Sequence, residues 1–81
     1  MRIMWKGEEF NGSPEEIIRQ AKLDSFIIEH TLRDFMDSVA YRIEIWSGDV
    51  IQFRTSDEFL RELNRVGAIQ IVREENDNVT P

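Results

Sequence analysis

The sequence predicts a small α+β domain in which a mixed β-sheet packs against helices, with the element order ββααβαβ. Three observations support this: two-residue apolar alternation near both ends of the chain, helical spacing of apolar residues between them, and cap or turn residues at the boundaries. A chain of 81 residues has room for one core. We therefore expect a single domain over residues 1–73 and a disordered acidic tail over residues 74–81.

The first segment has the pattern of a β-hairpin. A two-residue loop at Gly7-Glu8 favours a type II′ turn, because glycine is preferred at the first position of that turn. This register pairs Trp5 with Phe10 across the hairpin and puts Ile3 on the same face. We assign that face to the core.

Two helices should follow the hairpin. Residues 13–16 read Ser-Pro-Glu-Glu, a capping box with proline at the first helical position, so a helix begins at Pro14 and ends near Asp24. Thr31 caps the next helix, which ends at Ser47-Gly48. The predicted buried stripe of this second helix comprises Leu32, Phe35, Met36, Val39, Ile43 and Trp46.

The last part of the fold reads as strand, helix and strand. Residues 50–54 have strand composition, and Thr55 begins a third helix that ends at Gly67. Residues 68–73 alternate as a final strand, with Ile69 and Ile71 on one face. A right-handed parallel crossover and an antiparallel return are both open for this unit. The buried stripe of the third helix is Phe59, Leu60, Leu63 and Val66.

Composition bounds the classes of function. The formal net charge is −6, which argues against direct nucleic-acid binding, because such affinity comes from clustered Lys and Arg. The chain has no cysteine, no signal-peptide pattern at residues 1–7 and no apolar run long enough for a membrane span. We expect a cytoplasmic protein that is not a membrane protein.

The sequence offers no recognisable catalytic, cofactor or metal site. Two of its four acidic pairs, Glu15-Glu16 and Asp57-Glu58, fall at helix starts, where carboxylates complete caps and favour the helix dipole; Glu8-Glu9 lies in the hairpin turn and Glu74-Glu75 in the tail. His30 is the only histidine, too few for a zinc site without cysteine. The glycines are isolated at turns rather than grouped to cradle a phosphate. We therefore expect neither an enzyme nor a cofactor.

One helical face is a candidate partner-binding surface. Tyr41 and Ile45 lie opposite the predicted buried stripe of the second helix, on the side that also carries Asp34 and Asp37. The apolar pair could bind a partner, or it could pack within the domain beneath the apolar Phe26-Ile27-Ile28 connection. Intramolecular burial is the favoured interpretation, because small cores recruit the apolar residues that they have.

Three stretches together resemble small uncharacterised proteins of bacteria and their mobile elements. They are residues 5–18 (WKGEEFNGSPEEII), residues 33–40 (RDFMDSVA) and residues 56–60 (SDEFL). The resemblance implies a small cytoplasmic α+β protein, and it implies no activity.

The function that follows from these observations is a non-enzymatic protein-interaction module, accessory or regulatory, with a protein partner or a second copy of itself. The alternative is an acidic inhibitor from a mobile element that imitates nucleic acid, with carboxylates in the place of phosphates. A third hypothesis is a small carboxylate-dependent enzyme that uses Asp34, Asp37 and His30.

Overall fold

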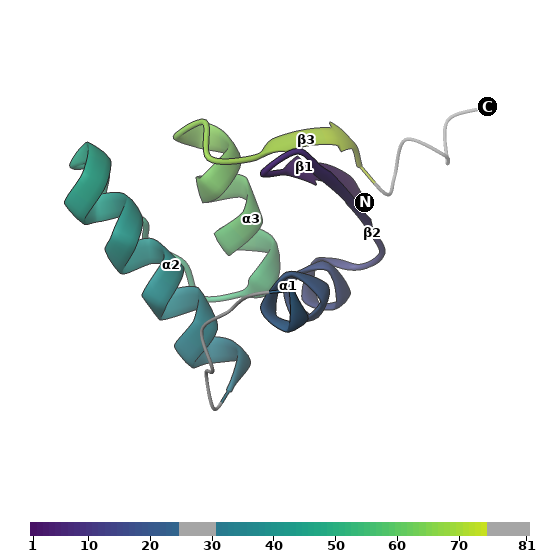
Figure 1. Ribbon diagram of the computed structural model, residues 1–81, viewed down its shortest axis with the longest axis horizontal. Helices are drawn as coiled ribbons and strands as arrows, with labels where there is room; N and C mark the ends of the chain where they lie inside the picture. The colour runs from purple at the N-terminus through teal and green to yellow at the C-terminus, as the bar shows by residue number, and fades with distance from the viewer. Residues whose placement is uncertain (25–30, 75–81) are drawn as a thin grey trace.

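The structure, a computed structural model, describes residues 1–24 and 31–74. Its elements are β1 (Arg2–Trp5), β2 (Glu8–Asn11), α1 (Pro14–Leu23), α2 (Leu32–Ser47), α3 (Ser56–Arg65) and β3 (Gln70–Arg73). A small sheet lies at one side of the molecule, α2 lies at the other, and α1 and α3 lie between them (Figure 1). The predicted α+β class is confirmed.

The sheet is antiparallel, with the strand order β2-β1-β3. The prediction of a mixed sheet was therefore wrong in this detail, and β3 returns antiparallel to β1, the alternative that the sequence left open. Residues 50–54, predicted as a strand, form none within the described residues. Their composition suits a strand, but their backbone is bound by side chains of α3 instead of by a neighbouring strand. The observed order is ββαααβ, one strand fewer than predicted.

The hairpin turn lies one residue earlier than predicted. Trp5 pairs with Glu8 and Ile3 pairs with Phe10, so the two-residue loop is Lys6-Gly7. Both loop residues have positive φ, 54° and 78°, as a type I′ turn requires and a type II′ turn does not. This shift keeps each side chain on its predicted face of the hairpin, since both strands keep their alternation. Ile3, Trp5 and Phe10 are accordingly buried, as predicted.

One cluster of buried side chains joins the sheet to the helices. Trp5 is its link between layers: its ring lies 6.4 Å from that of Phe10 on the sheet and 6.3 Å from that of Phe35 on α2. Such aromatic contacts add to the burial of apolar area. The helices contribute part of their predicted stripes to this core: Ile17, Ile18 and Ala21 from α1, Phe35 and Met36 from α2, and Phe59, Leu60 and Leu63 from α3.

The helix ends are where the sequence predicts them. Ser13, Thr31 and Thr55 are N-caps whose hydroxyl oxygens accept hydrogen bonds from backbone N–H groups in the first turn. The capping box of Ser13 and Glu16 is complete. Gly48 ends α2 with φ 81°, a conformation that glycine adopts without strain. Local sequence therefore determines the length of each helix.

The hairpin turn gives a prediction about stability. A φ of 54° at Lys6 costs a residue with a β-carbon about 1 kcal/mol, whereas Asn-Gly is a favoured type I′ pair. We expect Lys6→Asn to raise the free energy of unfolding by about 0.5–1 kcal/mol, measured by urea denaturation with circular dichroism. Glu8→Asn, outside the turn, should give a smaller gain, because it relieves only the charge repulsion between Glu8 and Asp24. A gain at Glu8 with none at Lys6 would contradict the observed register.

Candidate protein-binding surface

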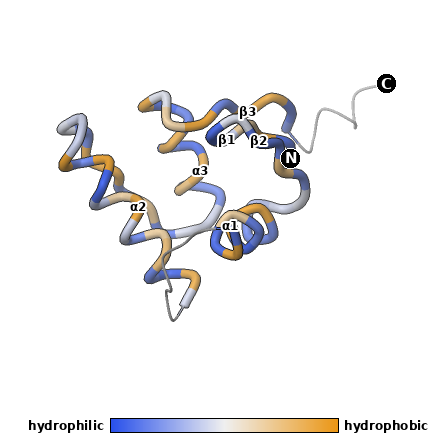
Figure 2. Tube along the Cα trace, viewed as in Figure 1, coloured by the Kyte–Doolittle hydropathy of each residue, from blue (hydrophilic) through white to orange (hydrophobic). Residues whose placement is uncertain are grey.

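Helix α2 is longer than the core can cover. It has 16 residues and α1 and α3 have 10 each, lengths of about 24 Å and about 15 Å at 1.5 Å per residue. The buried residues of α2 are Phe35 and Met36, both near its start. Leu32, Val39, Ala40 and Ile43 are only partly buried. Apolar and polar residues alternate along α2 as far as its C-terminal end (Figure 2).

Large apolar side chains are exposed at this far end of α2. The exposed fractions are 64% for Tyr41, 58% for Ile45, 86% for Trp46 and 52% for Val50 just beyond the helix. We call these four residues the α2 patch. Single exposed apolar residues are common on proteins, but a cluster of them marks an interaction site more often.

Two expectations from the sequence are wrong here. Trp46 belongs to the predicted buried stripe by its helical spacing, but it is exposed because it lies beyond the part of α2 that the rest of the domain covers. Tyr41 and Ile45 are more than half exposed, which contradicts the favoured interpretation of burial within the domain. The proposed cover, Phe26-Ile27-Ile28, lies outside the described residues.

Carboxylates accompany the patch on the exposed side of α2. Asp34 and Asp37 are both exposed, as predicted for one helical face. Asp37 pairs with Arg33 at 3.2 Å, and the Arg33 guanidinium also lies 4.3 Å from the centre of the Phe53 ring. Within residues 1–24 and 31–74, the side chains of Asp34, Arg42 and Glu44 make no hydrogen bond or ion pair. The structure thus brings the four predicted residues onto one exposed side. Trp46 and Val50, which the sequence analysis assigned elsewhere, are exposed as well, with Trp46 about 100° around the helix from Ile45.

The segment at residues 49–54 is held by side chains of α3 instead of by a strand. Arg65 donates from Nη2 to the carbonyl oxygen of Val50 at 3.2 Å, and the backbone N–H of Arg54 donates to Glu58 Oε1 at 2.7 Å. Inward-facing Ile51 is buried, and Phe53 packs edge-on against Phe59 at 4.9 Å. These contacts fix Val50 at the margin of the α2 patch.

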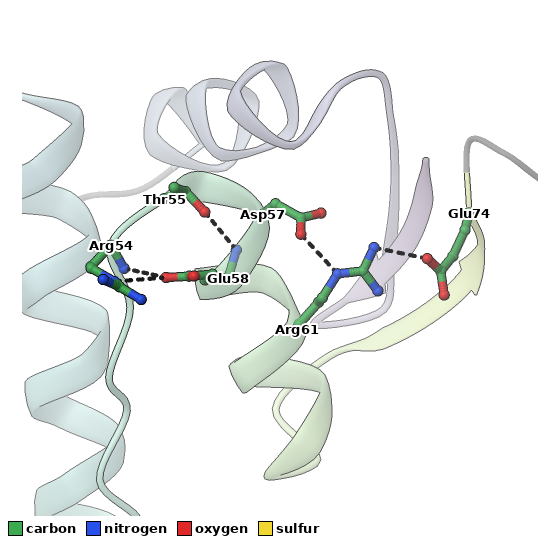
Figure 3. Close-up of polar contacts among 6 residues, drawn as sticks. All are labelled: Arg54, Thr55, Asp57, Glu58, Arg61 and Glu74. Atoms are coloured by element: carbon green, nitrogen blue, oxygen red, sulfur yellow. Dashed lines mark hydrogen bonds and ion pairs between the residues drawn. The ribbon is translucent and has the colours of Figure 1, made fainter.

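The same side of α3 lines a hollow whose charges are paired. The hollow has a volume of about 600 Å³ and lies beside Arg54, Glu58 and Arg61. Arg61 binds Asp57 and Glu74, each at 2.8 Å, and these carboxylates raise the pKa of its guanidinium (Figure 3). Glu74, predicted to begin the tail, is therefore bound to α3, whereas residues 75–81 lie outside the described part of the chain.

The carboxylate pKa values have structural causes. Hydrogen bonds from Arg65 lower the pKa of Glu62, and the backbone N–H of Gln52 contributes in the same direction. A hydrogen bond with Asp24, followed by charge repulsion, raises the pKa of Glu8. These groups stand at helix ends and turns. No cluster of three potential metal ligands occurs within the described ranges, and His30 lies outside them.

Comparisons with known proteins identify no relative. No protein-family model, curated protein or solved structure matches the chain. Among the described helices, none is long and apolar enough to cross a membrane. The resemblance to small bacterial and mobile-element proteins therefore stays a prediction.

The exposure of Trp46 can be tested by fluorescence. The chain has two tryptophans, Trp46 and the buried Trp5. We expect wild-type emission to be red-shifted and strongly quenched by acrylamide, because water surrounds Trp46. Trp46→Phe should leave a blue-shifted emission that acrylamide quenches several-fold less. Equal quenching of both proteins would mean that Trp46 is covered in solution.

The hydrogen bonds that join α3 to residues 49–54 predict that stability depends on pH. The pKa of Glu62 is lowered in the folded state, so its contribution to stability is present above its unfolded pKa and is lost as pH falls through the folded value. Glu62→Gln should lower the melting temperature slightly at pH 7, and the effect should disappear as pH falls below the folded-state pKa of Glu62, where both side chains are neutral. Thermal melts across this range would measure the difference. Glu44→Gln serves as control, because the Glu44 carboxylate makes no such bond. An identical pH profile for both variants would contradict the role of the bonds between Glu62 and Arg65.

Proposed function

We propose that this chain is a non-enzymatic protein-interaction module, accessory or regulatory in role, that binds a protein partner through the α2 patch. The observation that carries the proposal is the group of large apolar side chains exposed together at the end of α2. The cysteine-free composition and the resemblance to small bacterial proteins favour a cytoplasmic setting for this role.

The residue types in the patch are those that dominate binding energy at protein interfaces. Tryptophan and tyrosine are enriched among interface residues whose truncation costs most affinity, and each can bury about 150–250 Å². At about 25 cal/mol per Å², covering Trp46 and Tyr41 would supply several kcal/mol before the costs of association. The domain itself gains little of this energy, since both residues stay mostly exposed.

Helix α2 also presents the patch in a fixed conformation. Thr31 caps its start, Gly48 ends it, and Phe35 and Met36 anchor it in the core. Arg65 holds the backbone of Val50 beside it. A surface that is ordered before binding loses less conformational entropy on binding, which favours affinity.

The alternative functions have less support. A nucleic-acid mimic needs carboxylates free to replace phosphates, but many of them pair with arginines of the same chain. These paired carboxylates are Glu9, Glu15, Asp37, Asp57, Glu58, Glu62 and Glu74. An enzyme built on Asp34 and Asp37 would need a cleft, whereas both residues are exposed on a helix and Asp37 pairs with Arg33.

The proposal is tested by capturing partners of the tagged protein from its source cells at low and moderate salt. We expect a partner that stays bound at moderate salt and whose affinity falls at least about 30-fold in the double variant Ile45→Gln and Trp46→Gln, equivalent to about 2 kcal/mol. Glutamine keeps helix propensity and adds no charge, so the fold should be retained.

Leu23→Gln supplies the matched control, because Leu23 is an exposed apolar residue on α1, 85% accessible. It should bind the partner as the wild type does. Equal loss in the control and the double variant would mean general stickiness rather than a specific patch. A partner released by moderate salt and unaffected by the double variant would instead support nucleic-acid mimicry.

A further inference from the structure

The exposed side of α2 combines apolar anchors with negative charge. At 100° per residue, Asp34, Asp37, Tyr41, Glu44 and Ile45 fall within one side of the helix. The arginines of α2 lie at the margins of this side. Arg33 is engaged with Asp37 and Phe53, whereas Arg42 and the carboxylates of Asp34 and Glu44 are unpaired within the described residues. Three carboxylates against two arginines leave this side of α2 negative. A partner that covers this side therefore meets apolar surface flanked by carboxylates.

We propose that the occupant of this surface is a basic amphipathic helix of another protein, with an apolar stripe flanked by Lys or Arg. The inference rests on the proposed function and specifies the partner's chemistry. The apolar stripe would cover the α2 patch, and the cations would approach Asp34 and Glu44. Amphipathic helices bind apolar surfaces in this way, with charged flanks that determine orientation and choice of partner.

Spacing along α2 constrains that partner. Asp34 and Glu44 are ten residues apart on the helix, a rise of about 15 Å, and Tyr41 lies between them. A partner helix packed along α2 would match both carboxylates with cations about ten residues apart. Its apolar anchors would lie between them at three- and four-residue spacing.

Charge favours this occupant over a second copy of the chain. Each copy has a net charge of −6, so self-association brings two negative molecules together, whereas a basic segment is attracted over the Debye length of about 8 Å. The arginines that could offset the repulsion are largely engaged in pairs within the chain, such as Arg61 with Asp57 and Glu74.

The test uses three synthetic helical peptides without tryptophan. All carry the same leucine stripe, and the remaining positions are Lys, Gln or Glu. Binding to the full chain is followed by Trp46 fluorescence and mapped by backbone amide shifts. At low salt we expect the Lys peptide to bind at least about tenfold more tightly than the Gln peptide, which corresponds to about 1.4 kcal/mol of binding free energy. We expect the Glu peptide not to bind. Added salt should reduce this preference.

Variants separate the charge contribution from the apolar one. The pair Asp34→Asn and Glu44→Gln should remove most of the preference for Lys over Gln. The pair Glu9→Gln and Glu15→Gln, which removes an equal charge from β2 and α1, should leave the preference unchanged. The double variant Ile45→Gln and Trp46→Gln should abolish binding of the Lys peptide. Sedimentation velocity of the free protein should give a monomer.

Several results would overturn the inference. Equal binding of the Lys and Gln peptides would show that charge does not contribute to the preference. Failure of the Lys peptide to bind would reject a basic helix as the occupant. The proposed function is tested separately, by the capture experiment. Lys-peptide binding that survives the double variant would be nonspecific attraction to an acidic protein. A dimer that the double variant dissociates would make a second copy the occupant.

Discussion

The burial of α3 is the interaction on which the rest of the structure depends. Phe59, Leu60 and Leu63 are completely buried, and they join α1 on one side to the sheet on the other. The opposite side of the same ten-residue helix binds residues 49–54 through Glu58 and Arg65. One short helix therefore both closes the core and replaces the strand partner that residues 50–54 lack. Loss of its apolar face would remove the support for Val50 and the α2 patch as well.

The size of this core sets a second constraint. A domain of this length buries only about 60–65% of the surface that its unfolded chain exposes. Two ten-residue helices and four-residue strands can enclose the start of α2 but not its whole length. The sequence nevertheless continues helix-forming and apolar residues to Gly48. The extension gains little stability from packing, so its aromatic residues have to be explained by something outside the described residues.

Local features of the fold could be predicted from the sequence. Ser13, Thr31 and Thr55 define helix starts, because capping involves only residues within one turn. The features that could not be predicted are nonlocal. Strand formation at residues 50–54 depends on whether the chain brings them to an edge of the sheet, and here α3 side chains bind their backbone instead. The observed hairpin register differs from the predicted one because the loop is Lys6-Gly7 and not Gly7-Glu8. Both loops put the same side chains on the core face, so side-chain alternation cannot distinguish them.

The same distinction applies to the candidate surface. Helical spacing placed Asp34, Asp37, Tyr41 and Ile45 on one side, and all four are exposed, although burial was the favoured interpretation for Tyr41 and Ile45. Spacing gave the wrong environment for Trp46, because direction around a helix does not say where the neighbouring elements end. The sequence feature that could have indicated exposure is the position of Trp46 in the last turn of α2, which is longer than the other described helices.

The exposed apolar side chains and the unpaired carboxylates both lie on α2, and neither feature requires the other. Elsewhere the chain largely neutralises its carboxylates internally, as Arg2 does for Glu9 and Arg61 does for Asp57 and Glu74. On α2 the carboxylates of Asp34 and Glu44 stay unpaired within the described ranges, next to side chains that the core leaves uncovered. In natural proteins, residues that do not suit their surroundings in the folded chain occur mainly at functional sites. Both features occur on one well-capped helix, and the proposed binding role would account for them together, whereas packing within the domain accounts for neither.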